Sequence, residues 1–202
     1  YECPNCSNLI TRGSLKSGNT FGAKVFSDGK MIAPMQPDYP NLTKCQKCDT
    51  IFWLRDLSVI GKYERGTNQV EEWKHADEAK FLGIDDCYTA IRFGIAKNVK
   101  DELFIRQNIW WAYNDKIREG QEIFNDHSDE LRWIENVKKL RNLLDASDIN
   151  QKIMIAEINR NLGAFEASIK LIQSIDNSNL NWLKEKFLNE CKRRNRWVIE
   201  LD

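Results

Sequence analysis

The sequence predicts an α+β fold that is mostly α. A small β domain over residues 1–62 is followed by an array of antiparallel α-hairpins over residues 71–202. Three observations predict this order. Two C-x-x-C pairs lie in the first 50 residues, short apolar runs bounded by turn residues surround them, and the chain beyond residue 71 has helical apolar spacing with no proline.

The two cysteine pairs are Cys3-Pro-Asn-Cys6 and Cys45-Gln-Lys-Cys48. The C-x-x-C spacing lets a tight turn direct two thiolates toward one metal ion. Two such turns supply a complete tetrahedral set of sulfur ligands, which leaves no open position for water. We therefore expect one structural Zn²⁺, the only cofactor predicted, with Cys3, Cys6, Cys45 and Cys48 as its ligands.

Two other readings of these cysteines are open. An even number of cysteines allows disulfides, but disulfide frameworks are typical of small secreted chains, whereas most of this chain reads as helix. A redox dithiol needs only one C-x-x-C, next to a βαβ pattern that is absent here. The remaining Cys87 and Cys191 fit a reducing compartment, and no signal peptide is visible. A cytoplasmic location is expected.

Short strands are predicted on either side of the cysteine pairs, over Leu9–Thr11, Thr20–Phe26, Met31–Ala33 and Ile51–Leu54. Asp28-Gly29 lies between two of them, and Asp-Gly is typical of a type I′ hairpin turn. So small a sheet cannot bury enough surface to be stable by itself. The metal would supply the missing stability, which is the arrangement of a zinc ribbon.

Residues 55–70 have the composition of a linker, and helices are predicted beyond them. The predicted helices are Glu71–Phe81, one capped by Asp85 or Asp86, one from Asn98 to Arg118, one opened by Ser128, one from Asp148 to Leu162, Phe165–Ile175 and Leu180–Cys191. The third is apolar nearly all round, so Trp110 or Trp111 should be among the least exposed residues. Short polar turns between the helices imply antiparallel neighbours.

Composition excludes several classes of function. Lysine and arginine number 30, as do aspartate and glutamate, so the chain has no net charge to attract nucleic acid or an anionic membrane. No apolar run approaches the ~20 residues that span a bilayer. His75 and His127 lie in polar surroundings, and no phosphate loop or nucleophile motif occurs. We expect neither an enzyme nor a membrane protein.

The segment Ile155–Ile175 resembles a tetratricopeptide repeat (TPR). Leu162-Gly163 stands at the bend, an aromatic Phe165 follows two residues later, and a second apolar helix comes after it. Three positions depart from the pattern: Ser168, Ile175 and Leu180. The resemblance implies that the helical domain is TPR-like, a stack of helix pairs with a concave surface.

A second resemblance covers most of the chain. It rests on Cys3–Cys6, Ser17–Ala23, Ser27–Lys30, Ala33–Met35, Phe52–Leu54 and Trp110–Asp115. These segments are similar to a group of uncharacterised bacterial proteins in which a zinc ribbon precedes TPR-like helices. The resemblance implies an architecture and brings no activity with it.

Two functions follow from these patterns. The first is a non-enzymatic scaffold whose helices bind a protein or peptide partner; the TPR-like register would turn Asn150, Glu157, Arg160 and Asn161 toward the concave groove. The alternative is a zinc ribbon that binds nucleic acid. Its contacts would come from the basic residues near the hairpin and the cysteine pairs, namely Lys24, Lys30, Lys44 and Lys47.

Overall fold

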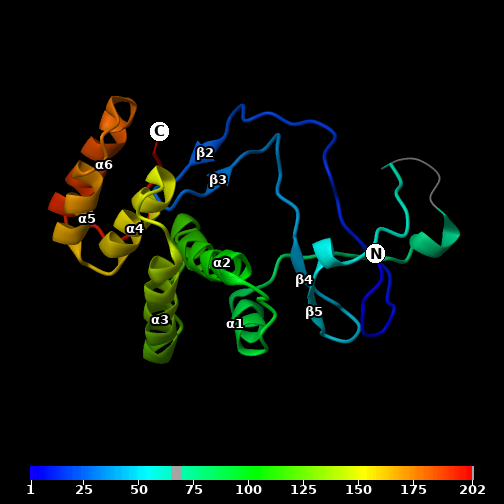
Figure 1. Ribbon diagram of the computed structural model, residues 1–202. Coiled ribbons are helices and arrows are strands. Elements are labelled where there is room, and N and C mark those ends of the chain that lie inside the picture. Colours follow the sequence, from blue (N-terminus) through cyan, green and yellow to red (C-terminus); the bar gives the residue numbers. More distant parts are fainter. Residues whose placement is uncertain (65–69, 202) are drawn as a thin grey trace. The chain divides into compact units, whose positions relative to one another are not determined.

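The computed structural model describes residues 1–64 and 70–201 (Figure 1). The chain forms two compact units. The cysteine unit comprises Tyr1–Asn19 and Gln36–Ile95, and the helical unit comprises Thr20–Met35 and Ala96–Asp202. These boundaries differ from the predicted domains 1–62 and 71–202. Residues 20–35 pack with the helices although they lie between the two cysteine pairs, and residues 71–95 pack with the cysteine unit.

The cysteine unit consists of two small ladders and one helix. Its elements are β1 (Ile10–Thr11), β4 (Leu42–Lys44), β5 (Ile51–Trp53), β6 (Asp77–Glu78) and α1 (Ile84–Arg92), with 3₁₀ turns at Leu54–Asp56 and Glu71–Trp73. Strands β4 and β5 pair antiparallel, and β1 and β6 pair parallel. The hydrophobic core of this unit includes Cys3, Cys45, Ile10, Phe52 and Leu54. The metal-ligand candidates are therefore part of the hydrophobic core.

The predicted helix over Glu71–Phe81 is wrong. After the 3₁₀ turn the chain becomes β6, because strand β1 offers it a hydrogen-bonding edge. The Leu9 carbonyl accepts a bond from the Asp77 N–H at 3.0 Å, and the Asn8 amide donates to the Asp77 carboxylate at 2.7 Å. Part of the predicted linker, residues 65–69, lies outside the described residues.

The hairpin predicted around Asp28-Gly29 is present, with β2 (Lys24–Val25) paired antiparallel to β3 (Met31–Ile32). Its predicted turn type is wrong. Gly29 has φ +77°, but Asp28 does not have the positive φ that a type I′ turn needs. The Gly29 N–H bonds to the Phe26 carbonyl at 2.9 Å, and the Phe26 N–H to Lys30 at 3.0 Å. Such a turn closes with a left-handed glycine and leaves Asp28 free to point inward.

The helical unit contains α2 to α6. Their bounds are α2 (Val99–Arg118), α3 (His127–Leu143), α4 (Ile149–Asn161), α5 (Phe165–Gln173) and α6 (Asn181–Lys192), with a 3₁₀ turn at Ser178–Leu180. Consecutive helices pack against one another, and Gly163, at φ +78°, lets the chain turn between α4 and α5. The predominance of helix after a few small strands is confirmed. Figure 1 shows the C-terminal tail lying beside β2.

Side chains at the helix starts explain where three helices begin. Asn98 accepts a bond from the Asp101 N–H, and Asp148 accepts one from the Gln151 N–H, as the sequence predicts. Helix α3 begins earlier than predicted, because Asp126 rather than Ser128 caps it. On this helix Trp133 is fully buried, whereas Leu131 is 52% exposed.

The prediction for Trp110 is confirmed: its side chain is fully buried in α2, and its indole N–H donates to Asn161 Oδ1 at 2.8 Å. Replacing Trp110 with alanine should lower the free energy of unfolding by about 3–5 kcal/mol, because a large cavity and an unpaired amide oxygen remain. Urea denaturation measures the change. The control is Trp182→Ala, since Trp182 is 49% exposed, and it should cost less than ~1 kcal/mol. Equal small losses for both variants would contradict the assignment.

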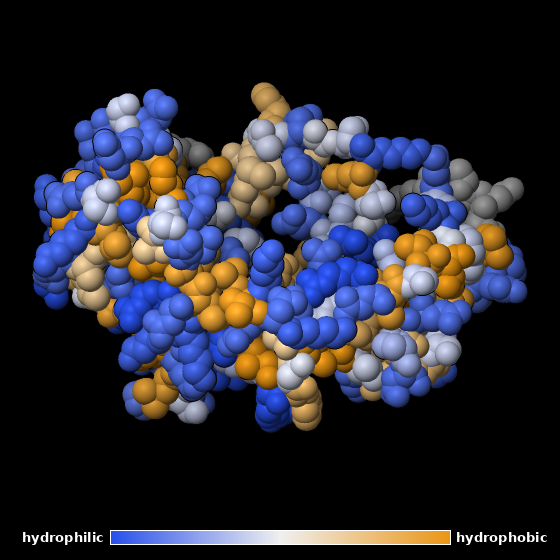
Figure 2. All heavy atoms as spheres, viewed as in Figure 1, coloured by the Kyte–Doolittle hydropathy of each residue, from blue (hydrophilic) through white to orange (hydrophobic). Residues whose placement is uncertain are grey.

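Hydrophilic residues cover most of the face drawn in Figure 2, with smaller apolar areas between them. Among the helices that the structure describes, none combines the length and apolar character needed to cross a membrane.

Candidate metal centre

The two C-x-x-C segments fold into the same turn. In the first, the Cys3 N–H bonds to the Asn8 carbonyl at 2.9 Å and the Ser7 N–H bonds back to the Cys3 carbonyl at 3.0 Å. In the second, Cys45 bonds to Thr50 at 2.9 Å and Asp49 to Cys45 at 3.0 Å. The residue after each pair, Ser7 or Asp49, has a left-handed φ of 55° or 58°. Two segments about 40 residues apart thus present their thiols through identical backbone geometry.

The four thiols converge on one point. The Sγ atoms of Cys3, Cys6, Cys45 and Cys48 all lie within 4.8 Å of one another, close enough to hold a metal ion. Cys3 and Cys48 are 3.6 Å apart and Cys6 and Cys45 3.7 Å, sulfur to sulfur. A tetrahedral zinc with Zn–S bonds of about 2.3 Å requires about 3.8 Å along each edge, so the set fits that ion. All four are free thiols, which excludes disulfides in this structure.

Electrostatics also favours a cation among these sulfurs. The Thr50 hydroxyl, 3.3 Å from Cys48 Sγ, and the Thr50 backbone N–H lower the pKa of Cys48 to about 6. A backbone hydrogen bond at Asn8 favours the Cys6 thiolate, but desolvation and the three neighbouring thiols outweigh it and raise the pKa of Cys6 to about 12. Four thiolates so close together repel one another unless a divalent ion neutralises them.

The other two cysteines, Cys87 and Cys191, are buried. Burial raises the pKa of Cys87 to about 12, and burial also raises the pKa of Cys191. Cys87 lies in the cysteine unit and Cys191 in the helical unit. Neither thiol is activated for chemistry, since the thiolate is the reactive form.

Alkylation of the thiols should therefore proceed in two stages. A strong chelator should expose five thiols, namely Cys3, Cys6, Cys45, Cys48 and the neighbouring Cys87, because the cysteine unit unfolds with its metal. Cys191 should react only after denaturant unfolds the helices. Mass spectrometry of iodoacetamide adducts reads out each stage. Modification of all six thiols without chelator, or of Cys191 in the first stage, would contradict this order.

The predicted groove residues lie elsewhere than expected. Asn150 is exposed near the start of α4, but Glu157, Arg160 and Asn161 are fully buried. The prediction that these three line an open groove is wrong. Their face of α4 is covered by the chain itself, namely by the hairpin residue Ser27 and by the C-terminal segment around Asn195 and Arg196.

Glu157 and Arg160 form a two-point ion pair at the centre of this contact. Arg160 Nη2 donates to Glu157 Oε1 at 2.7 Å and Nε to Oε2 at 2.9 Å. The Ser27 hydroxyl donates to Glu157 at 2.9 Å, and Arg160 Nη1 donates to the Asn195 carbonyl at 2.8 Å. Burial raises the pKa of Glu157, and the charge and hydrogen bonds of Arg160 oppose that shift. These charges are structural, because every partner is another part of the helical unit.

Asp28 anchors the hairpin at a second point. Its fully buried carboxylate accepts bonds from the Asn114 amide at 2.7 Å and from Arg118, both on α2. Its backbone carbonyl accepts a bond from the Trp111 indole at 3.1 Å. Sequence reasoning missed the role of Ser27 and Asp28. The only signal in the sequence is that two polar residues, Ser27 and Asp28, stand next to each other in a turn. That signal does not reveal which distant residues they contact.

The lysines predicted to contact nucleic acid are mostly paired with carboxylates. Lys24 bonds to Glu200 at 2.9 Å, Lys30 to Asp115 at 2.6 Å and Lys44 to Asp86 at 3.0 Å. Lys47 is exposed. The paired lysines offer little net positive charge to a phosphate backbone. Both histidines are exposed, as predicted.

Comparison with protein-family models, with curated proteins and with solved structures finds no match to this chain.

Proposed function

We propose that the chain is a non-enzymatic, zinc-containing interaction protein that binds a protein or peptide partner. The convergence of four thiols through two identical turns carries the zinc-binding part of the proposal. Cys3, Cys6, Cys45 and Cys48 would hold the zinc ion and, as four protein ligands, leave it no position for substrate. The metal would stabilise the fold of the cysteine unit, in the manner of a zinc ribbon.

A TPR-like relation of the helices is part of the proposal. Helices α4 and α5 form a hairpin around Gly163, with Phe165, Ala156 and Ser168 buried, and α6 packs on α5. This succession supports a stack of helix pairs such as the resemblance to uncharacterised bacterial zinc-ribbon proteins implies. The face of α4 is already occupied by the chain, so a partner would bind at another surface.

Cobalt substitution tests the structural role of the metal. Co²⁺ should replace zinc and give the intense visible absorption of a tetrahedral site with sulfur ligands. Azide and imidazole, which bind cobalt at an open coordination position, should leave the spectrum unchanged. A spectrum that shifts with either ligand would reveal an open position and contradict a purely structural site.

Nucleic acid is the alternative partner, and the carboxylate-paired lysines weaken its case. An electrophoretic mobility-shift titration with single- and double-stranded 30-mer oligonucleotides distinguishes a nucleic-acid partner from a protein or peptide partner. No retardation at micromolar protein and 50 mM salt is expected, whereas a shift that weakens steeply with salt would favour the alternative.

A further inference from the structure

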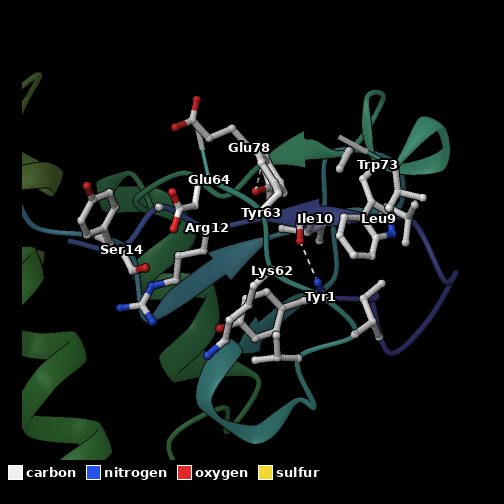
Figure 3. A pocket seen from close by; sticks show the side chains of 18 of the residues that line it. Tyr1, Leu9, Ile10, Arg12, Ser14, Lys62, Tyr63, Glu64, Trp73 and Glu78 are labelled. Atoms are coloured by element: carbon white, nitrogen blue, oxygen red, sulfur yellow. Dashed lines mark hydrogen bonds between the residues drawn. The ribbon is translucent and has the colours of Figure 1, made fainter. Parts of the chain in front are cut away.

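A pocket of about 1040 Å³ opens in the cysteine unit, separate from the cysteine cluster. Strand β1 and the chain that follows it line one part, and residues 59–64 together with Trp73, Ala76 and Glu78 line another (Figure 3). This pocket is not part of the proposed zinc site, because none of the four candidate zinc ligands lines it.

Aromatic rings form much of the pocket wall: Tyr1, Tyr39, Tyr63 and Trp73. Two rings lie directly on glycine backbone. A Cβ atom at Gly13 would overlap the Tyr39 ring, and a Cβ atom at Gly61 would overlap the Trp73 ring. Tyr63 and Trp73 lie 6.4 Å apart between ring centroids, and the Tyr63 hydroxyl is 3.2 Å from Thr11 Oγ1. Tyrosine, tryptophan and arginine are the residues that contribute most to binding at protein interfaces.

Arg12 is one of the charged residues that line the pocket. Its Nε atom is buried and has no hydrogen-bond partner among the described residues. Arg12 as a whole is only partly buried, and a carboxylate is the acceptor that matches the geometry of a guanidinium group. The described part of the chain contains no ion pair between Arg12 and an acidic side chain, whereas the neighbouring Lys16 is paired with Glu64.

The charge of the pocket suits one carboxylate better than a chain of phosphates. Arg12, Lys16 and Lys62 bring three positive charges, and Glu64 and Glu78 bring two negative ones. A nucleic-acid strand would place several phosphates close to those two carboxylates. A peptide with one acidic side chain next to an apolar one would instead place its carboxylate on the Arg12 guanidinium and its apolar side chain against the aromatic wall.

We propose that this pocket binds an extended peptide segment, with an aromatic or aliphatic side chain against Tyr39, Tyr63 and Trp73 and an aspartate or glutamate on Arg12. This inference rests on the proposed function and names the surface and the chemistry of its partner. The binding surface is then on the cysteine unit, and the metal keeps its walls folded.

A random heptapeptide phage library panned on the intact, zinc-loaded protein is the probe. Enriched peptides should carry an acidic residue within two positions of an aromatic or aliphatic one. Binding of a fluorescein-labelled synthetic copy is then measured by anisotropy. Arg12→Gln should weaken it at least tenfold, because a charge-assisted bond is lost. Gly61→Ala should also weaken it, because the added methyl displaces Trp73.

Arg92→Gln is the matched control, since Arg92 is exposed on α1 and does not line the pocket; its affinity should equal that of the wild type. Circular dichroism and zinc content verify that each variant is folded. A peptide with glutamine in place of its acidic residue should bind Arg12→Gln and wild type equally.

Two outcomes would overturn the inference alone: enriched peptides that bind Arg12→Gln as well as wild type, or displacement of the peptide by oligo(dT) at lower concentration than by unlabelled peptide. No enrichment at all would count against both the pocket and the proposed interaction function.

Discussion

Replacing Arg160 with methionine is expected to lower the free energy of unfolding of the helical unit by about 3–5 kcal/mol. The substitution leaves the Glu157 carboxylate buried without its cation, in a place that water does not reach. The Asn195 carbonyl also loses its donor. Urea denaturation followed by circular dichroism at 222 nm measures the effect, because α2 to α6 all lie in this unit.

Two further variants isolate the cause. Arg193→Met removes an exposed arginine, paired with Glu190 at 3.1 Å and 75% exposed, and should cost less than about 1 kcal/mol. The double variant Glu157→Leu, Arg160→Met should be more stable than Arg160→Met alone, since it removes the unpaired charge. If Arg160→Met were no more harmful than Arg193→Met, the buried ion pair would not hold the hairpin and the tail on α4.

Replacing Cys45 with serine is expected to unfold the cysteine unit while the helical unit stays folded. Cys45 is fully buried and belongs to both the candidate ligand set and the core of its unit. Strands of two or three residues cannot fold without the metal, whose binding contributes ~10–16 kcal/mol in small zinc domains. The helices have a core of their own around Ile172, Leu183 and Phe187. Hydrogen exchange should show loss of protection within residues 1–19 and 36–95.

Cys87→Ala is the matched control for that experiment, because Cys87 is a buried cysteine of the same unit outside the ligand set. It should keep its metal and its exchange protection. Protection retained in Cys45→Ser, or lost equally in Cys87→Ala, would show that the metal is not what folds the unit.

The sequence was sufficient where local chemistry decides the structure. The C-x-x-C spacing predicts both cysteine turns, and Asn98 and Asp148 mark helix starts because a cap bonds only to its own first turn. The hairpin was found for the same reason. Its turn type was not, because Asp-Gly also fits a turn in which only Gly29 is left-handed.

Local patterns could not predict that the hairpin packs against α4. Ser27 and Glu157 are 130 residues apart, and no periodicity connects them. Glu157 and Arg160, three positions apart on a helix, have the spacing of an ordinary surface ion pair. This ion pair is buried only because Ser27 and the C-terminal segment pack over it. The prediction for Glu71–Phe81 failed likewise, because a strand edge elsewhere in the chain outweighed helix propensity.

Elemental analysis of the purified protein tests the central claim most directly. Protein prepared without chelator should contain one zinc per chain, and Cys45→Ser should contain none. The matched Cys87→Ala variant should retain one. Wild-type protein that is folded, with six free thiols and no bound metal, would contradict the assignment of Cys3, Cys6, Cys45 and Cys48 as a metal site.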